Sequence, residues 1–286
     1  MAIVGPVFVW WILLQILGLA ALPIAFSLFR GLSDRGYAFA KPLGLLLSAY
    51  VLWILASLGF MENGRSAAAF SVLILAALGW GYYALARDRD PQREGLGEIL
   101  RRRWKAIVAV ELLFAAAFLG WAVIRAFNPE IEATEKPMEI AFLNAILRSD
   151  RFPPHDPWLS GFAISYYYFG YVMMAMLTRL SGVASGVAFN LGIALLFALT
   201  ATGAFGVVFN AVAKGGEPLR GGRGSEPLRG ARVGNPRRGS REGSAIRYGL
   251  LGSLFVAGIG NLEGLLEYLH SRGLGSNAFW NWIDIK

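Results

Sequence analysis

Seven stretches of this chain are apolar over close to the ~20 residues that a helix needs to cross the hydrocarbon core of a bilayer. They are residues 5–29, 39–60, 67–86, 106–127, 162–181, 187–213 and 247–267. Helix is the conformation expected for them, because lipid offers no hydrogen-bond partner to an open backbone. The sequence therefore predicts an all-α fold, a polytopic bundle of transmembrane helices. The first stretch is too long for a cleaved signal peptide and lacks its basic start, so we expect a retained span.

The composition agrees with a membrane protein and excludes several kinds of site. Of 286 residues, 56% are hydrophobic and only 16% are charged, whereas soluble domains are nearer a quarter charged. We therefore expect a multi-pass protein of the plasma membrane. The chain has no cysteine and two histidines, His155 and His270, which excludes disulfides, thiolate metal sites, cysteine nucleophiles and a His-rich metal site.

The formal net charge of +8 is concentrated in two loops. Nine basic residues lie between Lys214 and Arg247, and seven more lie between Arg87 and Lys105. Basic loops beside spans usually record membrane topology and contact with lipid headgroups. No folded reading surface accompanies this charge, so we expect membrane lipid as a partner and no nucleic acid.

Lysines and arginines also predict the orientation of the bundle. The loops after the first, third and fifth predicted spans carry eleven of them, against five after the second and fourth. The positive-inside rule therefore places the first set in the cytoplasm and the loop 128–159 outside. The segment after the sixth span contradicts this alternation, because it should be external and yet is strongly basic. We keep the assignment on the argument that long loops can cross regardless of charge.

Four parts of the chain follow from these patterns. Residues 1–105 form an N-terminal region of three spans with a basic cytoplasmic loop, and residues 106–213 form a core that includes the external loop. Residues 214–246 are rich in Gly, Arg and Pro and repeat with a period of nine, which predicts a disordered insertion. Residues 247–286 hold the last span and the start of a continuation, because nothing near Lys286 resembles a finished domain.

The loop 128–159 collects most of the residues that look able to do chemistry. They are Glu130, Glu132, Glu135, Glu139, Asp150, His155 and Asp156. Within the loop, apolar residues from Met138 to Ile146 recur at helical spacing and predict an amphipathic helix at the membrane surface. The glutamates near its start either complement the helix dipole, act as a general base on an acceptor hydroxyl, or bind a divalent cation.

The turn that follows this helix, Pro153 to Trp158, admits two interpretations of Asp156. It is either an ordinary turn residue that accepts from backbone N–H groups, or it faces the same cavity as Glu135. His155 beside it suggests a proton relay. No serine stands in a nucleophile-elbow pattern, so we do not expect a Ser/His/Asp hydrolase.

Tyrosines open the predicted fifth span. Tyr166, Tyr167, Tyr168 and Tyr171 either belong to the aromatic belt of the membrane surface or line a polar cavity that binds a sugar or phosphate. Glu263 in the last span lies either within the apolar layer, where an ionisable group is a functional candidate, or at a surface if the helix ends at the preceding glycines.

A longer run of residues carries a resemblance. It comprises residues 135–149 (EKPMEIAFLNAILRS), 152–161 (FPPHDPWLSG) and 166–171 (YYYFGY), and residues 260–264 (GNLEG) add to it. This run resembles the YYY membrane-protein family, which is named for its three tyrosines, and the similarity extends over residues 105–286. The resemblance implies an uncharacterised polytopic membrane protein that is longer than this chain.

A looser resemblance concerns the arrangement of the loop. An acidic residue after a span, an interfacial helix, a proline-containing turn and a Tyr-rich span are similar to the first external loop of C-type-fold glycosyltransferases, such as the dolichyl-phosphate-mannose protein mannosyltransferases. This resemblance implies transfer of a sugar from a polyprenyl-phosphate donor at the outer membrane face. It implies Glu135 as the base and Asp156 as a helper, with Glu139 competing for the role of Glu135.

The same hypothesis nominates residues that bind the substrate. Arg148 and Arg151 are the expected partners of a phosphate, since guanidinium groups bind phosphates well. His155, Tyr167, Tyr168 and Tyr171 are the other expected contacts. Two alternatives stay open, which are a transporter or flippase with paired charges deep in its spans, and a structural protein whose basic loop binds a partner.

Overall fold

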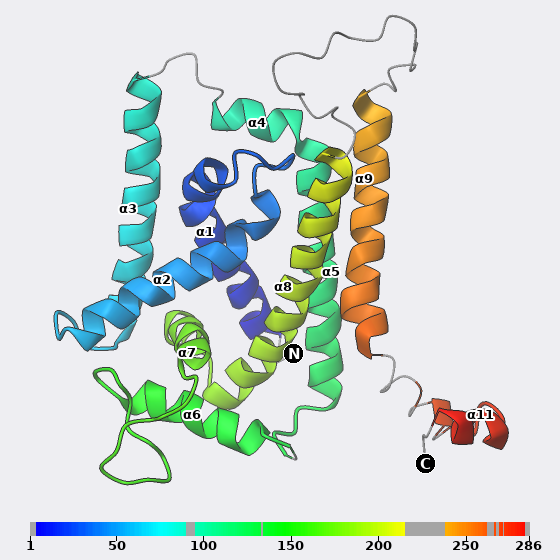
Figure 1. Cartoon of the computed structure of the whole chain (residues 1–286). Coiled ribbons are helices and arrows are strands. Elements are labelled where there is room, and N and C mark those ends of the chain that lie inside the picture. The colour runs from blue at the N-terminus through cyan, green and yellow to red at the C-terminus, as the bar shows by residue number, and fades with distance from the viewer. Residues whose placement is uncertain are drawn as a thin grey trace, which may run out of the picture.

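The computed structural model describes residues 4–89, 95–132, 134–214, 238–261, 266, 269–270 and 272–283, and within these ranges all regular elements are helical, as Figure 1 shows. The α-helices are α1 Val4–Leu28, α2 Ala40–Ser57, α3 Arg65–Arg89, α4 Leu96–Arg102, α5 Trp104–Phe127, α6 Lys136–Arg148, α7 Phe169–Ser181, α8 Ser185–Lys214, α9 Arg238–Ser253 and α11 Asn277–Trp282. A 3-10 turn, Tyr37–Phe39, precedes α2. The prediction of an all-α helical membrane bundle is confirmed.

Among the described residues, five helices are long and apolar enough to cross a membrane. They are Val4–Leu28, Tyr37–Ser57, Arg65–Arg89, Trp104–Phe127 and Ser185–Ala213. Each coincides with one of the seven predicted stretches.

The predicted span at 162–181 is wrong. The helix there, α7, has 13 residues and is therefore about 20 Å long, which is too short to cross. It begins only at Phe169, so Tyr166, Tyr167 and Tyr168 precede the helix instead of opening it. It ends at Gly182, whose φ of 68° is the left-handed conformation that closes many helices.

The last predicted span, 247–267, is not among these five helices, and the helix that covers its first residues begins earlier than expected. Helix α9 starts at Arg238 and continues through a π-helical turn, Leu254–Gly258, and a 3-10 turn, Ile259–Asn261. Glu263 lies outside the described residues, so its predicted role is untested by the fold.

Helix α9 runs alongside α8 (Figure 1). Glycines permit this approach, because a Cβ on Gly249 would lie 2.8 Å from the Phe205 ring and one on Gly252 would lie 2.6 Å from Val208. The Ser253 hydroxyl adds a hydrogen bond of 2.7 Å to the Ala201 carbonyl. Small residues and hydroxyl bonds are what hold helices together where lipid competes for apolar surface.

The core of the bundle joins α1, α2, α3, α5, α7 and α8. Trp10, Phe114, Phe118 and Met176 are among its fully buried side chains. Although α7 is short, it is inserted among the long helices, and the Trp10 indole N–H donates to the Ser181 hydroxyl at 3.1 Å. Helix α7 is thus a packed half-helix and not a span.

The two ends of the bundle differ in charge and in elements. One end holds α4, the α1–α2 connection, the end of α8 and the start of α9 (Figure 1). We call it the basic end, because Arg101, Arg102 and Arg103 lie there. The opposite end, which we call the acidic end, holds α6 and residues 128–168.

The predicted placement of the segment 214–246 on the opposite side from the basic loop 87–105 is contradicted. Lys214 ends α8 and Arg238 begins α9, and both helix ends lie at the basic end (Figure 1). The Asp34–Asn210 hydrogen bond of 2.8 Å ties this part of α8 to the α1–α2 connection. The error has a simple cause, since one predicted span too many inverted the alternation. The disorder predicted for 214–246 is wrong for Lys214 and residues 238–246, which are helical, and residues 215–237 lie outside the described residues.

Candidate functional site

The predicted amphipathic helix is α6, with Pro137 in its first turn and an apolar face made by Phe142, Leu143, Ala145 and Ile146. This face is buried against other helices. Leu143 and Ile146 form a cluster with α7 and α8, and Phe142 packs edge-on against Tyr171 with ring centroids 5.7 Å apart. The structure therefore covers with protein the face that we expected to lie on lipid.

Packing of α6 on α7 brings Glu139 to Tyr171. The Tyr171 hydroxyl lies 3.5 Å from Glu139 Oε1, a long hydrogen bond in which the phenol donates. Burial raises the pKa of Tyr171 to about 12, and the negative charges of Glu139 and, more weakly, Glu135 act in the same direction. A carboxylate and a protonated phenol thus face one another at the acidic end.

A small cavity of about 80 Å³ lies beside this pair. Its wall consists of Glu139, Leu143, Tyr171, Met174, Phe189, Gly192, Ile193 and Leu196. The carboxylate and the phenol are its ionisable groups, and the remaining side chains are apolar. Apolar walls with a few convergent polar groups are typical of small-molecule sites, although those sites are larger, at about 300–1,000 Å³.

Glu135 occupies a different environment from Glu139. It is the residue that caps the start of α6, yet its side chain makes no capping hydrogen bond and is exposed to solvent. Its charge still acts on Tyr171, which places it in the same neighbourhood. Sequence spacing had put both glutamates near the helix start, and the packing of α7 distinguishes them.

Asp156 is engaged in a turn. Its Oδ1 accepts from the backbone N–H groups of Trp158 at 2.8 Å and Leu159 at 2.9 Å. Its own N–H donates to the Phe162 carbonyl at 2.9 Å, and the exposed His155 pairs with Ala163 in an isolated β-bridge. Asp156 is therefore a turn residue that accepts from backbone N–H groups, which was the first of the two interpretations. Its carboxylate stabilises a compact hairpin.

The neighbouring Tyr167 and Tyr168 line a separate hollow whose other walls are also mostly aromatic. Tyr167 is 86% exposed, and the Tyr168 hydroxyl accepts from the Trp53 indole N–H at 3.0 Å. Tyr50 and Phe169 join them around an open hollow of about 460 Å³. Tyr167 and Tyr168 are therefore grouped together, and Tyr171 belongs to the Glu139 cavity instead.

The expected phosphate partners lie at the far end of α6. Arg148 is exposed in the last turn, about 13 Å along the helix axis from Glu139. Arg151 reaches toward Gly59 in the turn between α2 and α3. Arg179 closes the end of α6 by donating to the Leu147 carbonyl at 2.8 Å. The structure does not bring these arginines to Glu139.

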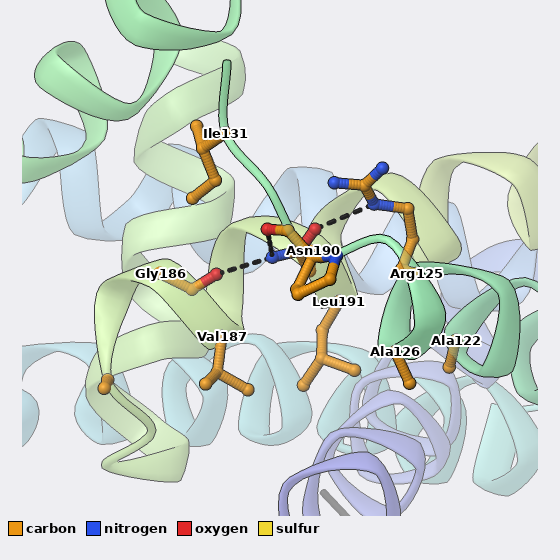
Figure 2. Close-up of a pocket in the computed structure, with 10 residues that line it drawn as sticks. Ala122, Arg125, Ala126, Ile131, Gly186, Val187, Asn190 and Leu191 are labelled. Atoms are coloured by element: carbon orange, nitrogen blue, oxygen red, sulfur yellow. Dashed lines mark hydrogen bonds between the residues drawn. The ribbon is translucent and has the colours of Figure 1, made fainter.

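A different arginine lies in a cavity wall. Arg125, at the end of α5, donates through Nε to the Asn190 side-chain oxygen at 2.8 Å and through Nη2 to the Glu130 carbonyl at 3.0 Å. Figure 2 shows it beside a cavity of about 310 Å³ between the end of α5 and the start of α8. In the sequence, nothing distinguishes Arg125 from an arginine at a span end that merely reaches the interface.

The structure also contains a buried charge pair that the sequence did not suggest. Lys41 of α2 forms an ion pair with Glu111 of α5, and the Tyr37 hydroxyl donates to the same carboxylate oxygen at 2.8 Å. The amide nitrogen of Gln15 is buried nearby without a protein partner and faces a cavity of about 30 Å³ that Lys41 also lines. A cavity of this size has room for about one water.

In the described part of the chain, no group of three or more His, Asp or Glu side chains could hold a metal ion. A divalent cation held by fewer carboxylates remains a prediction.

Fold and site together define a polytopic α-helical membrane protein with two short helices packed at one end. The family model described as uncharacterized membrane protein, DUF2298, matches residues 47–284, and the chain belongs to this family. No curated protein and no solved structure matches the chain. The family agrees with a membrane location.

Proposed function

We propose that this protein is a membrane transferase that moves a sugar from a polyprenyl-phosphate donor to a hydroxyl acceptor at the outer membrane face. The observation that carries the proposal is the Glu139 carboxylate, half-buried beside Tyr171 at an apolar cavity. A base positioned in such surroundings can act on a substrate hydroxyl, because fewer waters compete for it.

The chemistry assigns one step to each group. The acceptor hydroxyl gives its proton to the Glu139 carboxylate, its oxygen bonds to the anomeric carbon of the sugar, and the bond from that carbon to the lipid phosphate breaks. The electron pair leaves on the phosphate. Tyr171 holds the carboxylate in place, and the apolar side chains of the cavity exclude water. Glu139 is thus favoured over the exposed Glu135 as the base.

The test is transfer from a polyprenyl-phosphate sugar in membranes that contain single variants. Glu139→Gln keeps the shape of the side chain and should lower the rate by about 100-fold or more. Glu135→Gln should retain most activity, and Glu62→Gln, an exposed acid between α2 and α3, is the control at the same end. Full activity of a correctly folded Glu139→Gln variant would contradict the proposal.

A transporter or flippase is the second candidate, and the Lys41–Glu111 pair favours it. Paired charges among spans commonly mark substrate or ion pathways. In proteoliposomes, a flippase should move a labelled polyprenyl phosphate across the bilayer, and Lys41→Met should stop this movement. Movement at the rate of empty liposomes would exclude the transport function.

A further inference from the structure

Arg125 keeps a net positive charge in the wall of its cavity. Both of its bonds go to uncharged oxygens, the side-chain amide of Asn190 and the backbone carbonyl of Glu130. The Nη1 group of Arg125 takes part in neither of these two hydrogen bonds. Because Nε and Nη2 are held, the guanidinium is fixed in orientation and does not move freely as a surface arginine would.

Asn190 is itself held in place. Its amide nitrogen donates to the Pro129 carbonyl at 3.0 Å and to the Gly186 carbonyl at 3.0 Å (Figure 2). The amide oxygen is therefore turned toward Arg125, and the α5 end, the following loop and the first turns of α8 are joined through one side chain. The arrangement presents a pre-positioned cation.

The rest of the cavity is apolar. Ala122 and Ala126 of α5 face Val187 and Leu191 of α8 across it, and Ile131 closes one side (Figure 2). The volume, about 310 Å³, accommodates a headgroup and a few methylenes but not a whole lipid. An oriented guanidinium beside an apolar wall is complementary to a molecule with an anionic head and a hydrocarbon tail.

We propose that this cavity binds the phosphate group of a membrane lipid. Guanidinium groups bind phosphate oxygens with charge-assisted hydrogen bonds, and the fixed orientation favours phosphate over a diffuse counter-ion. The first methylenes of the lipid lie against Ala126, Val187 and Leu191. This inference goes beyond the transferase proposal, since it requires neither Glu139 nor any reaction.

The test measures thermal unfolding of the full chain in a neutral detergent with three probes. Phosphatidylglycerol should raise the unfolding midpoint, because a ligand that binds the folded state stabilises it. Diacylglycerol, which lacks the phosphate, and inorganic phosphate, which lacks the tail, should not. An equal shift with diacylglycerol, or with inorganic phosphate alone, would overturn the assignment to a phosphate-bearing lipid.

Variants locate the effect. Arg125→Gln should weaken phosphatidylglycerol binding at least tenfold by native mass spectrometry. Arg65→Gln, an exposed arginine at the acidic end that donates to the Leu180 carbonyl, should bind as wild type. Ala126→Trp fills the cavity while leaving the Arg125 bonds intact, and it should also lose the lipid. Wild-type binding by both cavity variants contradicts the proposal, whatever the activity of Glu139→Gln.

Discussion

Removal of Lys41 alone should destabilise the bundle strongly. The Lys41 side chain is 8% exposed and the Glu111 side chain 28% exposed, and Lys41 lies four residues into the second span. Lys41→Met keeps the aliphatic stem and deletes the charge, which leaves the carboxylate with only the Tyr37 hydroxyl. Breaking a buried pair in this way costs about 3–5 kcal/mol. Because water reaches Glu111, we take the lower limit, about 3 kcal/mol.

Removal of both charges should cost less than removal of one. In Lys41→Met with Glu111→Leu, no buried charge remains, and apolar replacements of buried pairs are often neutral or stabilising. The remaining cost is the Tyr37 hydroxyl, which loses its acceptor, and it amounts to about 1–3 kcal/mol. Adding Tyr37→Phe should recover that loss as well.

The measurement is the free energy of unfolding in detergent micelles, followed by circular dichroism. Lys105→Met is the matched control, because Lys105 is exposed at the start of α5 and should change stability by less than about 1 kcal/mol. Two results would refute the reasoning. One is a Lys41→Met cost no larger than that of the control, and the other is a double variant as unstable as the sum of its single changes.

Further predictions concern the acidic end. Cysteines placed at Ser165 and Ala184 should react with an impermeant thiol reagent from the same side, because the 13-residue helix between them cannot cross. Labelling from opposite sides would restore the predicted span at 162–181. Asp156→Ala should lower stability by about 1 kcal/mol, measured by thermal unfolding, whereas Asp156→Asn keeps the acceptor and should not. A folded but inactive Asp156→Asn would instead assign chemistry to the carboxylate. The folded state holds the Tyr171 proton up to about pH 12 while the unfolded tyrosine releases it near pH 10, so stability should fall as pH rises across this window. Ultraviolet titration should show a lower Tyr171 pKa in Glu139→Gln, and an unchanged value contradicts the proposed contact.

Much of the fold can be predicted from the sequence, because span length and helical periodicity depend only on residues that are close together in the chain. Residues 106–127 and 187–213 appear as the helices α5 and α8, and the spacing from Met138 to Ile146 appears as the buried face of α6. The span predicted at 162–181 is wrong because residues 162–164 pair with residues 154–156 in a hairpin, and the helix begins only at Phe169. Thirteen helical residues remain, which are too few to cross.

The candidate site depends on contacts that local sequence does not contain. Arg125 and Asn190 are 65 residues apart in the chain, and Lys41 and Glu111 are 70 apart. Each pair forms only when two helices pack in one register. The same holds for Glu139, whose burial comes from Tyr171 of another helix.

The short α7 also removes the conflict in the charge pattern. Without a crossing between residues 162 and 181, α5 and α8 connect at the acidic end, and both ends of the basic segment 214–246 meet α4 at the opposite end (Figure 1). The basic segments 87–105 and 214–246 therefore both connect helix ends at the basic end. The positive-inside rule now predicts, with no exception for a long loop, that the basic end faces the cytoplasm. The rule consequently predicts that the acidic end with Glu139 faces outward, which is the side that the proposed transferase using an outer-leaflet polyprenyl-phosphate donor requires.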